Sequence, residues 1–184
     1  MERWAPAEIV SAARTGDEAA VERLVGAVWP GCFRLAATVV GDRGLAQDAA
    51  QEACVIVHRK IRSLRSTEAF DAWLYRIVMR ESARVRRRNP APAEPPAEIA
   101  GASDDTSALD VWRALATLPP EQRDVVVLFY FDDLKSEEIA AVLRVRHPTV
   151  RTRLARARER LRGLLDDYRD ETAPARREMK QHVV

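Results

Sequence analysis

The 184-residue sequence is short of the residue types that build catalytic and metal sites. It contains two cysteines, three histidines and seven glycines. None of the glycines stands in a phosphate-cradling loop, and neither a nucleophile paired with a base nor a cluster of metal ligands is visible in the sequence. We therefore expect no enzymatic activity, no cofactor and no bound metal.

The two cysteines, Cys32 and Cys54, are expected to be reduced and buried. Both lie within helical patterns, and neither has a CxxC partner. His58 follows Cys54 by four residues, but two ligands do not make a zinc site. Apolar packing is the favoured role for both thiols.

Long apolar runs are also missing. No stretch of 18 consecutive apolar residues occurs, and the N-terminal segment MERWAPAEIV lacks the basic and apolar regions of a signal peptide. We therefore expect a cytoplasmic protein without membrane insertion.

Strand-like alternation is absent from nearly the whole chain, and helical periodicity takes its place. The apolar run VVVLFYF, Val125 to Phe131, is the one segment that could form a strand, but Pro119 and Pro120 just before it favour the start of a helix. The fold class is therefore predicted to be all-α. In the first half, a break at Trp29 and Pro30 is expected to separate two helices. The predicted helices of this half span residues 7–13, 17–28, 32–40, 45–61 and 67–88.

A segment that neither a helix nor a sheet would accept divides the chain. Residues 89–105 contain four prolines and a glycine, and residues 89–110 carry five acidic side chains and no basic one. About 18 extended residues reach at most about 60 Å, or about 17 base pairs of duplex. We predict a helical domain over residues 5–89, a flexible acidic linker over 90–106, a second helical domain over 107–168 and a disordered tail over 169–184.

The second domain contains the pattern of a helix-turn-helix. Ser136 is expected to cap a short helix, and residues 144–146 form the turn. The helix that follows has one apolar stripe, and residues 144–162 contain eight arginines against one acid. Such a helix fits a major groove, although a solvated surface, or one that binds an acidic protein or a membrane, has the same charge pattern. The stripe consists of Val150, Leu154, Ala157 and Leu161.

Taken together, these segments resemble the bacterial sigma-70 family, specifically its small extracytoplasmic-function (ECF) group. AQDAAQEACVIVHRKI (46–61) and FDAWLYRIVMRESARVRRR (70–88) resemble the family's region two, and residues 114–162 resemble its region four. The resemblance implies two small helical bundles and a promoter-specificity subunit. Such a subunit would bind core RNA polymerase through the largest-subunit clamp and the second-largest-subunit flap, recognise −35 and −10 promoter elements and support DNA melting. Members are often inhibited by an anti-sigma factor.

The resemblance also implies roles for individual residues. The predicted core polymerase contacts are Asp48, Gln51 and Glu52. The predicted −35 contacts of the recognition helix are His147, Thr149, Arg151, Thr152, Ala155 and Arg156. The predicted −10 contacts are Arg65, Ser66 and Phe70 near a captured base and Arg76, Arg80, Arg84 and Arg87 along the phosphates. Trp73 is assigned to core packing, because WLYRIV has the spacing of a buried helix face.

The atypical turn before the recognition helix means that the sequence does not predict which promoter sequence is read. The turn and the two residues after it read Arg144, Val145, Arg146, His147 and Pro148, and the side chain of Arg146 cannot accept the capping hydrogen bond that the family's usual serine accepts.

An alternative function is a stand-alone helix-turn-helix regulator, which would bind its DNA tightly without polymerase.

Overall fold

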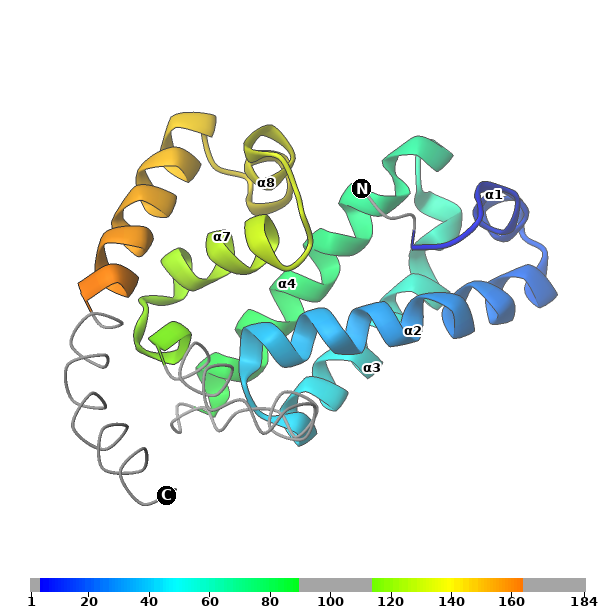
Figure 1. The fold of residues 1–184 in the computed structure, drawn as a ribbon. Coiled ribbons are helices and arrows are strands. Elements are labelled where there is room, and N and C mark those ends of the chain that lie inside the picture. Colours follow the sequence, from blue (N-terminus) through cyan, green and yellow to red (C-terminus); the bar gives the residue numbers. More distant parts are fainter. Residues whose placement is uncertain (1–3, 90–113, 164–184) are drawn as a thin grey trace, which may run out of the picture.

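The computed structural model describes residues 4–89 and 114–163, and within these ranges it contains helices and no strand (Figure 1). The all-α prediction is confirmed for these residues. The predicted linker over 90–106 and the predicted tail over 169–184 lie outside the described residues.

Four helices form the N-terminal group. They are α1 (Ala7–Thr15), α2 (Glu18–Val40), α3 (Arg43–Lys60) and α4 (Phe70–Arg88). Two short 3₁₀ turns, η1 (Ile61–Ser63) and η2 (Thr67–Ala69), lead from α3 into α4. Helix α2 packs against α1, α3 and α4. Its buried side chains Leu24 and Val28 share one apolar core with Val57 of α3 and Leu74 of α4.

Short polar signals in the sequence fix where these helices begin and end. The carboxylates of Asp17 and Asp42 accept hydrogen bonds from the backbone N–H groups of Ala20 (3.1 Å) and Leu45 (2.7 Å), so each caps the helix that it precedes. Gly41 ends α2 with a φ of 82°, a left-handed conformation that glycine adopts without strain.

The predicted break at Trp29 and Pro30 is wrong, because α2 continues through Pro30 as one helix. A proline removes one backbone hydrogen bond and crowds the carbonyl four residues earlier. That position is Gly26, and the buried side chains Val28 and Cys32 hold the helix against the core on both sides of the proline. By length and composition alone α2 could cross a membrane, but its apolar residues are the core of this bundle.

Two glycines of α2 should respond in opposite ways to alanine. A Cβ at Gly26 would meet no atom within 4 Å, whereas a Cβ at Gly31 would lie 2.7 Å from Cζ3 of Trp4. We expect Gly26→Ala to raise the free energy of unfolding by about 0.5–1 kcal/mol through helix propensity, and Gly31→Ala to lower it by about 1–3 kcal/mol through overpacking. Urea denaturation measures both. In a Trp4→Ala background the Gly31→Ala loss should disappear, and its persistence would show that Trp4 is not the obstacle.

The C-terminal group contains α7 (Pro120–Tyr130), α8 (Ser136–Leu143) and helical residues 114–117 and 147–163. The helical prediction for Val125 to Phe131 is confirmed up to Tyr130. Its apolar side chains are accommodated because Val125, Val126, Val127 and Leu128 are all buried. Helix α8 packs against α4, and α7 packs against α2, so the two groups are in contact.

The start of α8 differs from the prediction. Ser136 is the first helical residue and its side chain makes no cap; instead the Glu138 carboxylate accepts a hydrogen bond of 2.8 Å from the backbone N–H of Lys135. An acid in the first turn satisfies one of the free N–H groups there and also favours the helix dipole.

The turn after α8 lies at residues 144–146, as predicted, and holds Arg144 in a left-handed conformation, with a φ of 55°. An L side chain in this region costs free energy that glycine does not. We expect Arg144→Gly to raise the free energy of unfolding of this group by about 0.5–1 kcal/mol, measured by urea denaturation. Arg144→Ala is the control, because it removes the same side chain but keeps a Cβ at the positive φ. An equal gain there would contradict the conformational explanation.

The prediction that both cysteines are reduced and buried is confirmed. The sequence did not show that the two thiols are neighbours. Cys32 of α2 and Cys54 of α3 are hydrogen-bonded to each other, and this bond, with burial, raises the pKa of Cys32. Among the described residues no group of His, Cys, Asp and Glu side chains could hold a metal ion.

Candidate nucleic-acid interface

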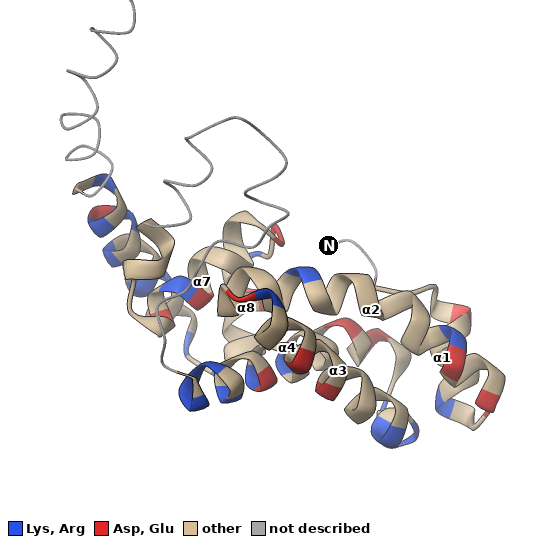
Figure 2. Cartoon of the chain, turned by 90° about the horizontal axis from the view of Figure 1, so that it is seen from below, with Lys and Arg blue, Asp and Glu red and all other residues tan. Residues whose placement is uncertain are grey.

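The helix of residues 147–163 carries arginine along its length (Figure 2), and all of these arginines except Arg153 are exposed. Three members of its predicted apolar stripe, Val150, Leu154 and Ala157, are at most 3% exposed, and the fourth, Leu161, is half-buried against the core. The predicted base-reading side chains lie on the remaining faces. Arg151, Thr152, Ala155 and Arg156 are exposed, and His147 and Thr149 are half-buried.

The entry of this helix is held by contacts that do not need a capping side chain. The carbonyl of Arg146 accepts hydrogen bonds from the backbone N–H groups of Thr149 (2.9 Å) and Val150 (3.3 Å). His147 Nε2 lies 3.4 Å from Oε1 of Glu137 in α8, so the imidazole links the two helices of the motif. The unusual turn therefore retains a helix-turn-helix geometry.

Two arginines of the helix are turned toward α7. Arg153 Nη2 donates to Oε2 of Glu121 (2.9 Å), and Arg158 Nε donates to the hydroxyl of Tyr130 (2.9 Å). The Arg158 guanidinium also lies over the Phe129 ring, 5.4 Å from its centroid. These contacts fix the helix on α7, and they turn Arg153 away from the predicted base-reading side chains.

A second set of arginines follows one flank of α4. Arg80 Nε lies 3.0 Å from Oε1 of Glu81, and Arg84 Nε lies 2.7 Å from Oε2 of the same carboxylate. Glu81 is only 5% exposed, so a buried acid fixes two neighbouring cations. Arg76 donates to the carbonyl of Ala72, and Arg87 is exposed. Sequence reasoning overlooked Glu81, although an acid with arginines one residue before and three residues after it is a detectable signal.

The predicted polymerase contacts lie next to this arginine flank. Asp48, Gln51 and Glu52 are exposed on α3. Glu52 Oε2 lies 3.6 Å from Nη2 of Arg84, so the acidic and the basic surfaces meet at this pair. Because exposed ion pairs contribute little to stability, both side chains remain available to partners.

The loop before α4 is ordered by a contact from α1. The Arg14 guanidinium donates to the carbonyls of Leu64 (3.4 Å) and Arg65 (3.1 Å). The side chain of Arg65 is exposed and that of Ser66 is half-buried. Phe70 is only 2% exposed and packs beside Trp73, with ring centroids 6.0 Å apart. In this conformation Phe70 offers no free face to a base.

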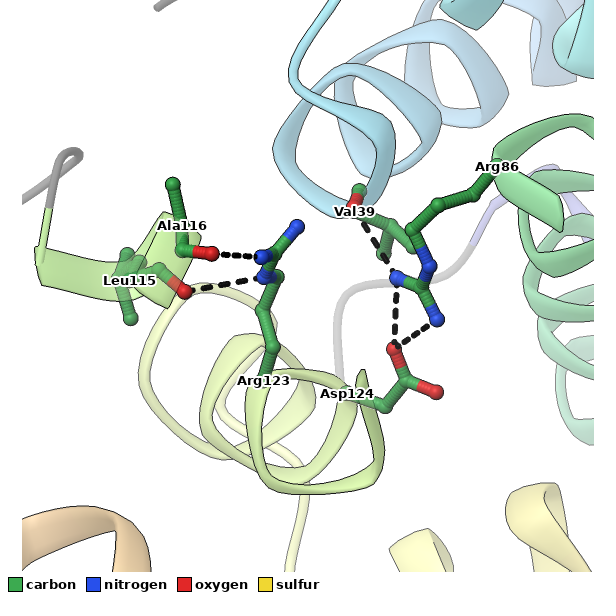
Figure 3. A network of polar contacts seen from close by, with 6 residues as sticks. All are labelled: Val39, Arg86, Leu115, Ala116, Arg123 and Asp124. Carbon is green, nitrogen blue, oxygen red and sulfur yellow. Dashed lines mark hydrogen bonds and ion pairs between the residues drawn. The ribbon is translucent and has the colours of Figure 1, made fainter. Parts of the chain in front are cut away.

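One arginine of α4 points toward the C-terminal group. Arg86 Nη1 donates to the carbonyl of Val39 (3.2 Å) and to Oδ1 of Asp124 (3.2 Å), and Nη2 donates to the same oxygen (3.3 Å) (Figure 3). Burial raises the pKa of the Asp124 carboxyl, although the charge of Arg86 opposes the shift. Arg123, the residue before Asp124, turns the other way and donates to the carbonyls of Leu115 and Ala116.

A second polar contact joins the groups further along α4. The Tyr75 hydroxyl donates to Oδ1 of Asp132 (3.4 Å), and the Tyr75 ring meets Trp4 edge-on, 4.9 Å between centroids. Burial raises the pKa of Asp132 to about 6. Asp124 and Asp132, like their α4 partners Arg86 and Tyr75, were outside the predicted site. Nothing in the sequence shows which face of α4 meets the second group.

Comparison with known proteins places both helical groups in the same family. Residues 21–90 match Sigma-70 region 2, and residues 108–161 match Sigma-70, region 4. The chain is 34% identical to the ECF RNA polymerase sigma factor SigE of Mycolicibacterium smegmatis, over 86% of this chain and 68% of the relative. It is 35% identical to the ECF RNA polymerase sigma factor SigM of Mycobacterium tuberculosis, over 86% of this chain and 84% of the relative.

Solved structures share the fold. CnrH, in complex with the cytosolic domain of CnrY, superposes with a TM-score of 0.70 at 24% identity, covering 88% of this chain and 97% of that one. The sigma factor RpoE of Bartonella quintana, in complex with the anti-sigma factor NepR, superposes with a TM-score of 0.65 at 24% identity, covering 79% and 96%. With both regions matched and relatives above 30% identity along most of their length, this chain belongs to the sigma-70 family and is a sigma factor of the ECF group.

Proposed function

We propose that this sigma factor binds core RNA polymerase, recognises −35 and −10 promoter elements and supports melting of the promoter duplex before RNA synthesis begins. The observation that carries this proposal is the pairing of two basic surfaces on different helical groups, one on residues 147–163 and one on α4. The second surface adjoins the acidic face of α3 through Glu52 and Arg84.

The acidic face of α3 is proposed to bind the clamp of the polymerase largest subunit. Asp48, Gln51 and Glu52 are exposed on neighbouring turns of one helix, which suits docking onto another helical element. The C-terminal group would contact the flap of the second-largest subunit.

The recognition helix is proposed to read the −35 element. An exposed arginine can contact guanine through two hydrogen bonds, and Thr152 or Ala155 can meet a thymine methyl group. His147 and Thr149 lie at the start of the helix, where the first contacts in a major groove are made. Arg153 is hydrogen-bonded to Glu121 and is not one of the residues proposed to contact bases.

The −10 element is proposed to meet the loop before α4 and the arginine flank. Arg65 and Ser66 would face a base that has left the stack, and Phe70 would support the pocket from beneath. Arg76, Arg80, Arg84 and Arg87 would follow the phosphates, and the buried carboxylate of Glu81 would hold two of them in place.

Transcription reconstituted with purified core polymerase tests the proposal. Templates would be selected from genomic fragments, and each start site would be mapped with and without this protein. We expect core-dependent initiation at a defined set of sites, and permanganate-reactive thymines near each start as evidence of melting. A charge reversal, Asp48→Arg, should reduce core binding, whereas Glu8→Arg on the far helix α1 should not. If the wild type binds core no better than an unrelated basic protein does, the proposal is wrong.

Gel shifts separate this function from that of a stand-alone regulator. A sigma subunit should bind its selected DNA weakly alone and tightly with core polymerase. Tight, sequence-specific binding by the isolated protein would instead support the regulator. The structural neighbours CnrH and RpoE were solved in complex with CnrY and with the anti-sigma factor NepR, and we propose that a protein of the anti-sigma class is a further partner of this chain.

A further inference from the structure

The loop of residues 63–69, which is proposed to meet the −10 element, is held by a helix that lies 50 residues earlier in the chain. Arg14 of α1 donates from Nη1 to the carbonyls of Leu64 (3.4 Å) and Arg65 (3.1 Å). Helix α1 also packs against the two short turns on either side of these carbonyls, η1 and η2. The match to Sigma-70 region 2 begins at residue 21, after α1 has ended. The resemblance therefore gave Arg14 no role.

The two carbonyls lie where the chain is extended between the short turns. Leu64 has a ψ of 129° and Ser66 has a ψ of 156°, so the segment does not continue either turn. A carbonyl in such a segment needs a donor from another part of the chain, and Arg14 supplies a charged one. Because Nη1 bonds the peptide groups on both sides of Arg65, it fixes the direction in which the Arg65 and Ser66 side chains leave the backbone.

The side chain of Ser66 belongs to the same cluster. Its hydroxyl donates a hydrogen bond to the Glu68 carboxylate, and the charge of Arg14 lies near that carboxylate. The backbone N–H of Glu68, the Ser66 hydroxyl and, more weakly, Arg14 all lower the pKa of Glu68. Arg14 therefore acts on the backbone of the loop and also on the acceptor that orients Ser66.

A second arginine ties the same elements in the opposite direction. Arg62 of η1 donates from Nη2 to the carbonyl of Gly16 (3.4 Å) and pairs with the carboxylate of Glu18. Gly16 ends α1 with a φ of 106°, so this contact reaches the turn between α1 and α2. The side chains of Arg62 and Glu18 are 56% and 70% exposed, and such pairs contribute little to stability. The half-buried Arg14 is therefore the stronger of the two ties.

We propose that Arg14 is a positioning residue for −10 recognition: it holds the two peptide groups beside Arg65, so that Arg65 and Ser66 already face the position of an unstacked base before DNA arrives. This inference rests on the proposed function, because it assumes that the loop contacts the −10 element. A loop that is ordered in advance loses less conformational entropy on binding. It also holds its side chains in one geometry, so Arg14 would increase the discrimination between bases as well as the affinity.

Amide hydrogen exchange in the full-length protein, without DNA or polymerase, tests whether Arg14 holds the loop. The reporters are the backbone N–H groups of Leu64 and Ala69, which donate to the carbonyls of Ile61 and Ser66. Arg14→Ala should speed their exchange by about tenfold or more and leave exchange in the middle of α2 and α4 unchanged. Unchanged exchange in the loop would overturn the proposal, and so would faster exchange throughout the N-terminal group.

Arg14→Lys is the conservative variant. A lysine ammonium carries three donors on one nitrogen, so it can bond both carbonyls as Nη1 does. We expect it to recover most of the protection of Leu64 and Ala69 that Arg14→Ala loses. If Arg14→Lys exchanges as fast as Arg14→Ala, the cation is not what holds the loop and the proposal is wrong.

Base preference with core polymerase tests the consequence for the promoter. Holoenzymes would be compared on a selected promoter and on variants with each other base at the captured −10 position. Arg14→Ala should reduce the preference for the favoured base by about tenfold, Arg14→Lys should restore most of it, and the affinity for core should stay unchanged. A loss of folded protein would instead lower binding to all these templates by the same factor, which would overturn the positioning role.

Salt dependence and a charge-matched variant separate positioning from a direct contact with DNA. If Arg14 binds a phosphate, Arg14→Ala should reduce the slope of log affinity against log salt concentration by about one; the proposal predicts the wild-type slope. Arg23→Ala removes the same charge from an exposed position on α2 and should match the wild type in loop exchange and base preference. An equal loss in Arg23→Ala would show that net charge is responsible and would overturn the proposal.

The two experiments also distinguish this inference from the proposed function. A wild type that does not initiate with core polymerase would contradict the proposed function and, with it, the −10 role of Arg14, whereas the exchange data would still show whether Arg14 orders the loop. A wild type that initiates, together with an Arg14→Ala variant that keeps full base preference, would overturn the positioning role alone.

Discussion

Phe70→Ala is expected to lower the free energy of unfolding of the N-terminal group by about 3–5 kcal/mol, because it removes a ring that is almost fully buried. Phe70 begins α4, directly after the loop of residues 63–69, and packs beside Trp73. The lost ring would leave a cavity at the point where the loop joins the bundle. Urea denaturation, followed by helical circular dichroism, measures the change.

Phe70→Leu distinguishes support of the loop from stacking on a base. Leucine keeps an apolar side chain in the core at a cost of about 1.5 kcal/mol or less, but it cannot stack. If Phe70 only supports the pocket, Phe70→Leu should transcribe and melt promoter DNA nearly as well as the wild type. A stable Phe70→Leu protein whose open complexes lack permanganate-reactive thymines would show instead that the ring leaves the core and stacks on DNA.

Arg156→Ala is expected to weaken binding of the polymerase holoenzyme to a selected promoter by about 5- to 150-fold, the equivalent of about 1–3 kcal/mol for one bidentate contact with a base. Arg156 is exposed on the proposed reading face of the recognition helix. The loss should be confined to promoters with the preferred base at one −35 position, so discrimination there should relax. Filter binding to a set of single-base promoter variants measures it.

Arg153→Ala is the matched control on the same helix. Its guanidinium is committed to Glu121, and an exposed ion pair of this kind contributes up to about 1 kcal/mol to stability. We expect little change in promoter affinity and none in base preference. Arg156→Ala could instead weaken binding to all sequences equally and reduce the slope of log affinity against log salt concentration by about one. In that case Arg156 contacts a phosphate and the base-reading assignment is wrong.

Much of the local structure follows from short-range rules that need no tertiary information. The aspartates before α2 and α3, the glycine after α2 and the two prolines at the start of α7 mark helix ends through their own hydrogen bonds or φ preferences. The stripe of Val150, Leu154 and Ala157 is buried because a helix places these positions on one face. The break expected at Pro30 failed because core packing on both sides of the proline outweighs one lost hydrogen bond.

The sequence by itself determined that this protein is helical, that its basic charge is collected on two segments and that these segments resemble regions two and four of a sigma factor. Periodicity, capping residues and charge are properties of neighbouring positions, so they can be seen in one chain. Only the tertiary structure decided that Glu81 holds two arginines, that Phe70 is buried and that Arg86 faces Asp124 rather than the solvent. Each of these depends on which helix faces meet, and that choice is made by packing among residues far apart in the sequence.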